Sequence, residues 1–159
     1  MNENENTLFN FYTAFANADA ETMCKCYHPD IQFRDPIFEL VKGSAVCDMW
    51  RMIIQKSEGK IKIDFNEIKA TEFIGSARWI ATFDFSTTNR RVINIIKAEF
   101  HFKDGLIIKH TDNFDLWKWS KQALGLQGYL FGWTGFFQTK INEQAILSLK
   151  KYKENDDAY

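Results

Sequence analysis

Two neighbouring runs of alternating apolar and polar residues constrain the fold of this chain most strongly. They cover residues 91–102 and 106–114, and the residues between them, 103–105, read Lys-Asp-Gly. Alternation with a period of two predicts strands with one buried face, and the short Asp-Gly turn predicts an antiparallel hairpin. Similar alternation at residues 61–66 and 78–85 predicts two more strands, so this half of the chain should form an antiparallel meander.

Helical periodicity dominates the residues before the meander. Apolar residues recur at three- and four-residue spacing over residues 7–18, where Thr7 is a fair N-cap, and shorter runs at 20–27 and 45–56 have the same pattern. Helices first and one curved antiparallel sheet afterwards predict an α+β fold. In such a fold the helices cover one face of the sheet, and the bent sheet leaves a cone-shaped cavity.

The C-terminal part predicts two more helices, at residues 116–124 and 138–153. Between them, residues 125–137 combine glycines with aromatic residues but lack the strand-then-helix setting of a phosphate-binding loop. We interpret this segment as a flexible aromatic flap. Nothing in the pattern indicates a linker or a repeat, so we expect one domain over residues 1–159.

The charge balance excludes some classes of partner. Lys and Arg total 20 against 21 for Asp and Glu, which gives a formal net charge of -1. No excess positive charge is present to hold a nucleic acid backbone or an anionic membrane, so we expect neither partner. Aromatic residues make up 16% of the chain, which favours a cavity with aromatic walls. The expected partner is a small apolar molecule.

The cysteines and the N-terminus indicate the compartment. Three cysteines without a regular framework favour free thiols in a reducing environment. Cys24, Cys26 and His28 form a C-x-C-x-H pattern, but on a helix the first two would point to different faces, so we expect no metal and no cofactor. The polar N-terminus does not resemble a signal peptide, and no apolar stretch is long enough to span a bilayer. We therefore expect a cytoplasmic protein.

The last predicted strand carries a His and a carboxylate on one face. With a period of two, Ile108, His110, Asp112 and Phe114 share the face that should point into the cone. An Asp that fixes the tautomer of an imidazole is a common arrangement for moving protons near neutral pH. The alternative is a structural hydrogen bond that allows two polar groups to be buried together. Both interpretations stay open at this point.

The order of these elements resembles a known superfamily. The stretches NADAETMCKCYHPDIQFRDP and FHFKDGLIIKHTDNFD, with a helix and a meander between them, resemble the nuclear transport factor 2-like superfamily, most closely its SnoaL-like branch, over residues 7–120. The resemblance implies a cone-shaped, cystatin-like α+β fold that is often a homodimer through the outer face of the sheet. The superfamily includes ketosteroid isomerase, limonene epoxide hydrolase and polyketide cyclases, so the fold alone does not determine the function.

The resemblance implies candidate catalytic residues. Asp35 matches the position of the isomerase base, whereas the Tyr of the oxyanion hole falls on Phe11 and its Asp falls near Ala98. Without those donors an enolate would lack several kcal/mol of stabilisation, which argues against steroid isomerisation by that mechanism. His110 and Asp112 resemble the polar pair on the last strand of the SnoaL-like cyclases. The predicted catalytic residues are therefore Asp35, His110 and Asp112.

Several residues are predicted to contact the ligand. The inner faces of the other elements supply the set Tyr12, Trp79, Phe83, Asn94, Phe100 and Phe114. Two functions remain: an acid-base enzyme of the isomerase, cyclase or hydrolase type on a small apolar substrate, or a module that binds a ligand or a protein without chemistry. The epoxide hydrolase version is the weakest, because no Arg falls convincingly on an inner face.

Overall fold

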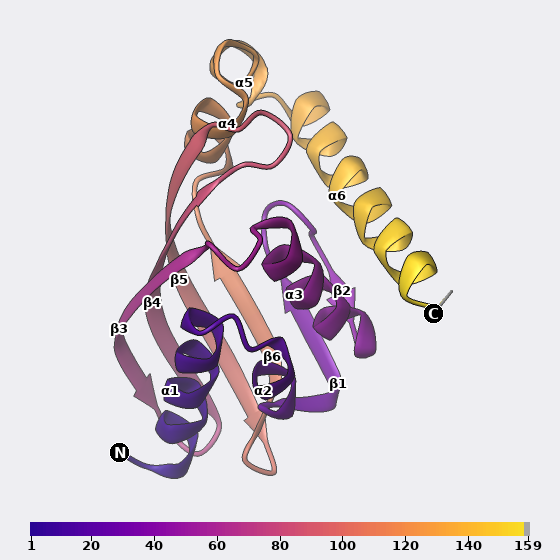
Figure 1. Ribbon diagram of the computed structural model, residues 1–159. Coiled ribbons are helices and arrows are strands. Elements are labelled where there is room, and N and C mark those ends of the chain that lie inside the picture. The colour runs from indigo at the N-terminus through magenta and orange to yellow at the C-terminus, as the bar shows by residue number, and fades with distance from the viewer. Residues whose placement is uncertain (158–159) are drawn as a thin grey trace.

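A six-stranded sheet curves around three N-terminal helices in the computed structural model, which describes residues 1–157 (Figure 1). The strand order is β2-β1-β6-β5-β4-β3, and every pair is antiparallel except β1 with β6. The strands are β1 Tyr27–Arg34, β2 Val41–Lys42, β3 Lys62–Ala70, β4 Ile74–Asp84, β5 Arg91–Lys103 and β6 Leu106–Asn113. The predicted α+β fold with a curved antiparallel sheet is confirmed. Residues 158 and 159 of the expected domain lie outside the described residues.

Helices line the concave side of the sheet and extend beyond its edge. The helices are α1 Glu3–Ala16, α2 Ala20–Lys25, α3 Ser44–Lys56, α4 Leu116–Leu124, α5 Leu126–Phe131 and α6 Gly135–Asp156. In Figure 1 α4 and α5 lie at the upper end, and α6 descends on the far side of α3. The α6 helix is tied to the loop after β1, because the Asn142 Nδ2 group donates to the Ile37 carbonyl at 3.0 Å.

The first helix begins earlier than predicted. Its N-cap is Asn2, whose side chain accepts from the Glu5 N–H while the Glu5 carboxylate accepts from the Asn2 N–H. This reciprocal capping box satisfies two backbone groups without any apolar residue. The expectation that the helix starts at Thr7 was wrong because it followed apolar periodicity, which is absent from the capping turn.

The β5–β6 hairpin forms at the predicted turn but contains an irregularity. Asp104 and Gly105 both have positive φ, as a tight hairpin turn requires. Between His101 and Phe102 the register shifts by one residue, so that Ile107 pairs with Phe102 and becomes fully buried. The prediction that Ile108 faces the interior is therefore wrong. Beyond this bulge the alternation resumes, which leaves the His110 and Asp112 side chains inside.

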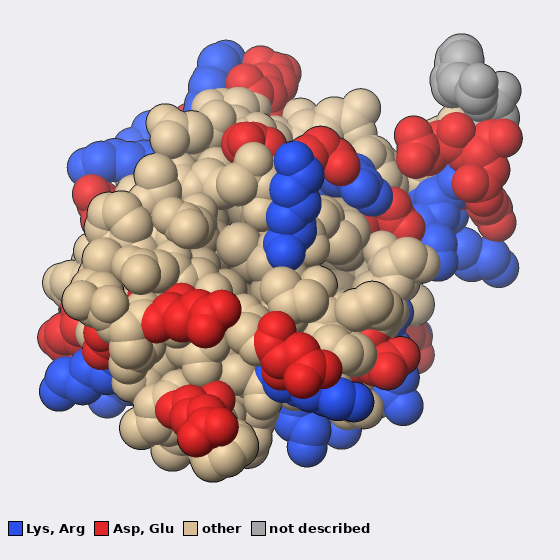
Figure 2. Space-filling model, turned by 90° about the horizontal axis from the view of Figure 1, so that it is seen from below, with Lys and Arg blue, Asp and Glu red and all other residues tan. Residues whose placement is uncertain are grey.

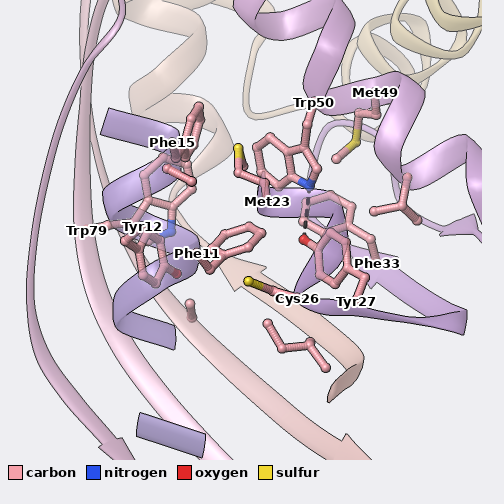
Figure 3. Close-up of a cluster of buried hydrophobic side chains, with 14 of the residues drawn as sticks. Phe11, Tyr12, Phe15, Met23, Cys26, Tyr27, Phe33, Met49, Trp50 and Trp79 are labelled. Atoms are coloured by element: carbon pink, nitrogen blue, oxygen red, sulfur yellow. Dashed lines mark hydrogen bonds between the residues drawn. The ribbon is translucent and has the colours of Figure 1, made fainter. Parts of the chain in front are cut away.

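Aromatic side chains from distant elements fill the space between the sheet and the helices (Figure 3). Phe15 on α1 contacts both Trp50 on α3 and Trp79 on β4, with ring centroids 5.0 and 5.4 Å apart. Edge-to-face and tilted contacts of this kind add to the burial of the rings themselves. The core therefore holds α1 and α3 against the sheet at fixed distances.

The prediction about the cysteines needs correction. Cys24 on α2 and Cys47 on α3 form a disulfide with a Cα–Cα distance of 5.6 Å, so the expectation of three free thiols was wrong. Twenty-three residues separate these cysteines in the sequence, and only the packing of α2 on α3 brings them together. Among the described residues, none of the helices has the length and apolar character needed to cross a membrane.

The segment predicted to be a flap is largely helical. It contains α5 and the first turn of α6, which begins at Gly135, three residues before the expected start. The α5 helix packs closely on α4 through Gly128, where a Cβ would lie only 1.9 Å from the Ser120 carbonyl oxygen. The glycine at this position permits helix contact, which is a requirement that the local sequence does not reveal.

We expect Gly128→Ala to destabilise the packing of α5 on α4, because the new methyl group would clash with rigid backbone. Overpacking of this kind costs about 1–3 kcal/mol. The matched control is Gly135→Ala, since nothing lies within 4 Å of its Cβ position. Chemical denaturation should show a lower free energy of unfolding for Gly128→Ala alone. Equal stabilities for the two variants would contradict the contact.

Candidate acid-base pocket

A cavity of about 510 Å³ lies between the inner face of the sheet and helices α3 and α6. Its walls are mainly aromatic and aliphatic, and they include Phe33, Trp50, Trp79, Phe83, Phe114 and Phe137. Two buried polar residues reach it from the sheet, Asp112 and Asn94, and the half-buried Asp35 reaches it from the end of β1. An apolar cavity with a few convergent polar groups is the usual form of a small-molecule site.

A chain of hydrogen bonds runs behind one wall of this cavity. The Trp50 indole donates to the Tyr27 hydroxyl at 2.9 Å, and that hydroxyl lies 2.8 Å from His110 Nδ1. His110 Nε2 lies 2.9 Å from Asp112 Oδ1, which also accepts from the Trp79 indole at 3.2 Å. Figure 3 shows the first of these contacts, between Trp50 and Tyr27. We refer to this set as the Tyr27–His110–Asp112 chain.

The donors and acceptors of this chain determine a single pattern for a neutral imidazole. An indole N–H can only donate, so the Tyr27 oxygen accepts from Trp50, and a carboxylate can only accept, so Nδ1 of a neutral ring is left to accept the Tyr27 proton. Nε2 must then carry the ring proton and donate it to Asp112. Every N–H and O–H donor of the chain has an acceptor in this arrangement, and both bonds to Asp112 use Oδ1. The other oxygen, Oδ2, is left for whatever occupies the cavity.

His110 itself is sealed from the cavity. Its side chain is 0% exposed, and the rings of Phe100, Phe33 and Phe11 surround it at centroid distances of 4.5, 5.0 and 5.6 Å. It is also absent from the cavity wall. His110 can therefore act on a bound molecule only through Asp112, as a positioning residue.

Asp35 directly follows β1, whose last residues pair in parallel with β6, and it lines the same cavity as Asp112. Its Oδ1 accepts from the backbone N–H groups of Ile37 at 2.9 Å and Phe38 at 2.6 Å. Burial, with a smaller contribution from the charge of Asp112, raises the pKa of this carboxyl and the two backbone donors lower it, which leaves a pKa of about 7. A carboxyl with a pKa near neutrality can serve as an acid or as a base.

The structure separates the predicted ligand contacts into two groups. Trp79, Phe83, Asn94 and Phe114 line the cavity together with both aspartates. Tyr12 and Phe100 do not line it; they are buried beneath the wall and contact each other at a centroid distance of 6.3 Å. These two residues are on the predicted inner faces, but other side chains cover them. Periodicity identifies the face of a residue but not its depth.

Sequence reasoning missed Tyr27 and Trp50 as parts of the site. Tyr27 was predicted to end a helix, but it is the first residue of β1 and pairs with Ile107 on the parallel strand β6. Trp50 was recognised only as part of the apolar stripe of α3. No local signal indicates that an indole and a phenol separated by 23 residues share a hydrogen bond.

Other reactive side chains offer no second centre. Within residues 1–157, no three His, Cys, Asp or Glu side chains are grouped as metal ligands would be. Of the residues in the C-x-C-x-H pattern, Cys24 is in the disulfide and Cys26 is buried. Burial raises the pKa of the Cys26 thiol to about 11, which makes it a poor nucleophile at neutral pH.

Comparison with known proteins places the chain in a family. The sequence model of the SnoaL-like domain matches residues 9–110, more than half of the chain. The chain belongs to the SnoaL-like domain family. This confirms the predicted membership of the nuclear transport factor 2-like superfamily. No protein with a curated description matches the chain.

Solved structures show the same SnoaL-like architecture at low sequence identity. IdmH, a putative polyketide cyclase from Streptomyces antibioticus, is 18% identical with a TM-score of 0.64, over 79% of this chain and 100% of that one. An epoxide hydrolase of M. tuberculosis that resembles limonene epoxide hydrolase is 20% identical with a TM-score of 0.62, over 80% and 95% of the two chains.

A third solved structure is TerC, crystallised with polyporic acid, which is 15% identical with a TM-score of 0.62, over 72% of this chain and 92% of that one. At these identities the likeness shows the fold alone.

We expect Tyr27→Phe to destabilise the protein, because it removes the partner of both the Trp50 indole and His110 Nδ1. Each buried group left unpaired costs about 1–3 kcal/mol. Tyr12→Phe is the matched control: this tyrosine is also buried, but its hydroxyl has no hydrogen-bond partner within the described part of the chain. Urea unfolding should show a clear loss for Tyr27→Phe and little change or a gain for Tyr12→Phe. Similar losses for both variants would contradict the hydrogen-bond chain.

The raised pKa of Asp35 predicts a pH-dependent cost in stability. The unfolded carboxyl releases its proton near pH 3.8 and the folded one near pH 7, so the folded state holds more protons in this window. The free energy contributed by Asp35 therefore falls as the pH rises from about 4 to 7, by at most about 4 kcal/mol. Asp35→Asn keeps an acceptor for both N–H groups without the charge. Its melting temperature should exceed that of the wild type by a margin that grows between pH 5 and 8. A margin independent of pH would contradict the assignment.

Proposed function

We propose that this SnoaL-like protein is an acid-base enzyme that moves a proton on a small, mostly apolar substrate held in the cavity. The observation that carries the proposal is the pair Asp35 and Asp112, two carboxyl groups in different surroundings that line one aromatic cavity. Pairs of titratable groups whose surroundings separate their proton affinities are typical of acid-base sites. Such a site can serve an isomerase or a cyclase equally well.

Asp112 is proposed as the base. Two buried donors fix its Oδ1, and Oδ2 is left to accept a proton from a bound molecule. The Trp79 indole and His110 keep the carboxylate in one rotamer, while Tyr27 keeps the imidazole in one tautomer. Positioning of this kind lowers the cost of reaching a reactive geometry.

Asp35 is proposed as the acid. With a pKa of about 7 it is protonated in roughly half of the molecules at neutral pH, so it can donate to a developing oxyanion. In ketosteroid isomerase a protonated Asp has this donor role. At the positions that correspond to the isomerase donors, Phe11 and Ala98 are buried and apolar. The chemistry would therefore use a different set of donors, to which the cavity-lining amide of Asn94 can also contribute.

The proposed reaction is proton transfer next to a carbonyl group. Asp112 takes a proton from the carbon, and Asp35 gives a proton to the carbonyl oxygen, which yields an enol. Return of a proton at another carbon is an isomerisation, and attack of the enol on a second carbonyl is a cyclisation. The hydrolase version has less support, because no Arg is among the described residues that line the cavity.

Non-catalytic binding is the second candidate, and the same wall residues would serve it. The expected homodimer through the outer face of the sheet also stays a prediction. Ile93 and Ile95 on that face are 49% and 42% exposed and would suit such a contact.

Hydrogen-deuterium exchange into cyclic ketones tests the proposal directly. A panel of cyclic ketones and 1,3-diketones would be incubated with the protein in D₂O, and mass spectrometry would measure deuterium gained beside the carbonyl. We expect enzyme-dependent exchange that falls as the pH rises above about 7, and losses of roughly 10²–10⁴-fold in Asp35→Asn and Asp112→Asn.

Asp84→Asn is the matched control for the exchange experiment. Asp84 also lines the cavity, but its side chain is exposed and paired with Arg91 at 2.7 Å. Its replacement should leave exchange unchanged. Quenching of tryptophan fluorescence by the ketones without any exchange would instead support a binding module, because the cavity wall contains Trp50 and Trp79.

A further inference from the structure

The α5 helix and the turn into α6 carry a dense group of exposed apolar side chains. Six of them are between 48% and 75% exposed: Leu126, Tyr129, Leu130, Phe131, Trp133 and Phe136. We refer to these six residues as the aromatic tip. Exposed apolar residues are normal when scattered singly, but a contiguous group of this size marks a surface that contacts something else. In Figure 1 α5 lies at the upper extremity of the molecule, beyond the sheet.

The backbone beneath the aromatic tip is held in place by hydrogen bonds. The Trp117 indole on α4 donates to the Tyr129 carbonyl at 3.2 Å, and the Trp133 indole donates to the Leu130 carbonyl at 3.1 Å. The Gln138 side chain donates to the Gly132 carbonyl, and the Thr134 hydroxyl caps α6. The two indole rings therefore lie against the tip with their polar atoms satisfied, which leaves an apolar outer surface.

The charge around the aromatic tip differs from that of the whole chain. Residues 116–142 contain Lys118, Lys121 and Lys140 but no Asp or Glu. Lys121 Nζ lies 4.2 Å from the centre of the Trp117 ring, next to α5. Figure 2 views the opposite end of the molecule, where acidic and basic side chains are interspersed. Asp115 and Glu143 flank this stretch, and Glu143 pairs with Lys140 at 3.4 Å, so the positive charge beside the tip comes mainly from Lys118 and Lys121. The net charge of -1, from which we expected no membrane partner, does not reveal it.

We propose that the aromatic tip docks on the surface of a membrane that contains anionic lipids. Trp and Tyr favour the interfacial layer of a bilayer, where an apolar ring and a polar group are both accommodated. Lysines beside such a surface gain from the negative potential of the headgroups. A surface helix with aromatic and leucine residues on one side and lysines nearby has the composition of an interfacial anchor.

The aromatic tip is continuous with the rim of the cavity. The Phe131 ring on α5 lies 6.3 Å from the Phe137 ring, and Phe137 and Lys140 both line the cavity. Docking would therefore bring the cavity rim to the lipid surface, where apolar molecules accumulate. The docking itself does not depend on the proposed acid-base chemistry.

Vesicle sedimentation tests the proposal with the full chain. The probes are phosphatidylcholine vesicles with and without phosphatidylglycerol. We expect binding to the vesicles with phosphatidylglycerol, a blue shift of tryptophan emission on binding, and weaker binding at high salt. The double variant Trp133→Ser with Phe136→Ser should lose at least about tenfold in affinity, and Lys118→Gln with Lys121→Gln should lose about as much.

Phe73→Ser is the matched control, because Phe73 is 65% exposed in the turn between β3 and β4, away from the aromatic tip. It should bind vesicles as the wild type does, and all variants should keep the wild-type melting temperature. Equal loss in Phe73→Ser, or no binding to either vesicle, would overturn the proposal. A wild-type oligomer that dissociates in the Trp133→Ser, Phe136→Ser variant without vesicle binding would assign the tip to a contact between copies of the chain.

Discussion

The buried Tyr27–His110–Asp112 chain is the constraint on which the rest of the structure depends. Its members and their two indole partners come from α3, β1, β4 and β6, and all are at most 6% exposed. Polar groups at this depth are costly unless each finds a partner, so the four elements must meet in one arrangement. The parallel pairing of β1 with β6 supplies that arrangement, because it places Phe33 and Tyr27 beside the face that carries His110.

The two aspartates of the cavity lie in different surroundings. Asp112 is fixed by side-chain donors from inside the core, whereas Asp35 is held by backbone donors at the end of a strand. Burial near the charge of Asp112 raises the pKa of Asp35 to about 7. An aromatic cavity lined by two carboxyl groups, one of which has a pKa raised to about 7, is the physical basis of the proposed proton transfer.

The C-terminal helices add features beyond the part that matches the SnoaL-like domain, which ends at residue 110. The α6 helix supplies a wall of the cavity, and α4 supports α5 through the close contact at Gly128. Gly128 and Gly132 let α5 lie close to Ser120 of α4. The large side chains of α5 are therefore directed outward, where they form the exposed aromatic tip. The proposed membrane contact and the proposed chemistry thus occur at neighbouring surfaces.

Local sequence patterns determined much of this protein. The period-two alternation predicted the long strands and the inward direction of His110 and Asp112. The Lys-Asp-Gly turn predicted the hairpin that joins β5 to β6. The helix over residues 116–124 also followed from the sequence. These features depend on contacts within a few residues, or on which face of an element is apolar.

Only the tertiary structure decided the features that depend on distant partners. The disulfide of Cys24 with Cys47 and the bond between Trp50 and Tyr27 join different elements of the chain, and the bulge that turns Ile107 inward depends on how β6 pairs with β5. The depth of Tyr12 and Phe100, and the need for glycine at Gly128, likewise depend on what another element places against them. Periodicity reports the direction of a side chain, whereas its partner and its distance from a cavity are set by packing between elements.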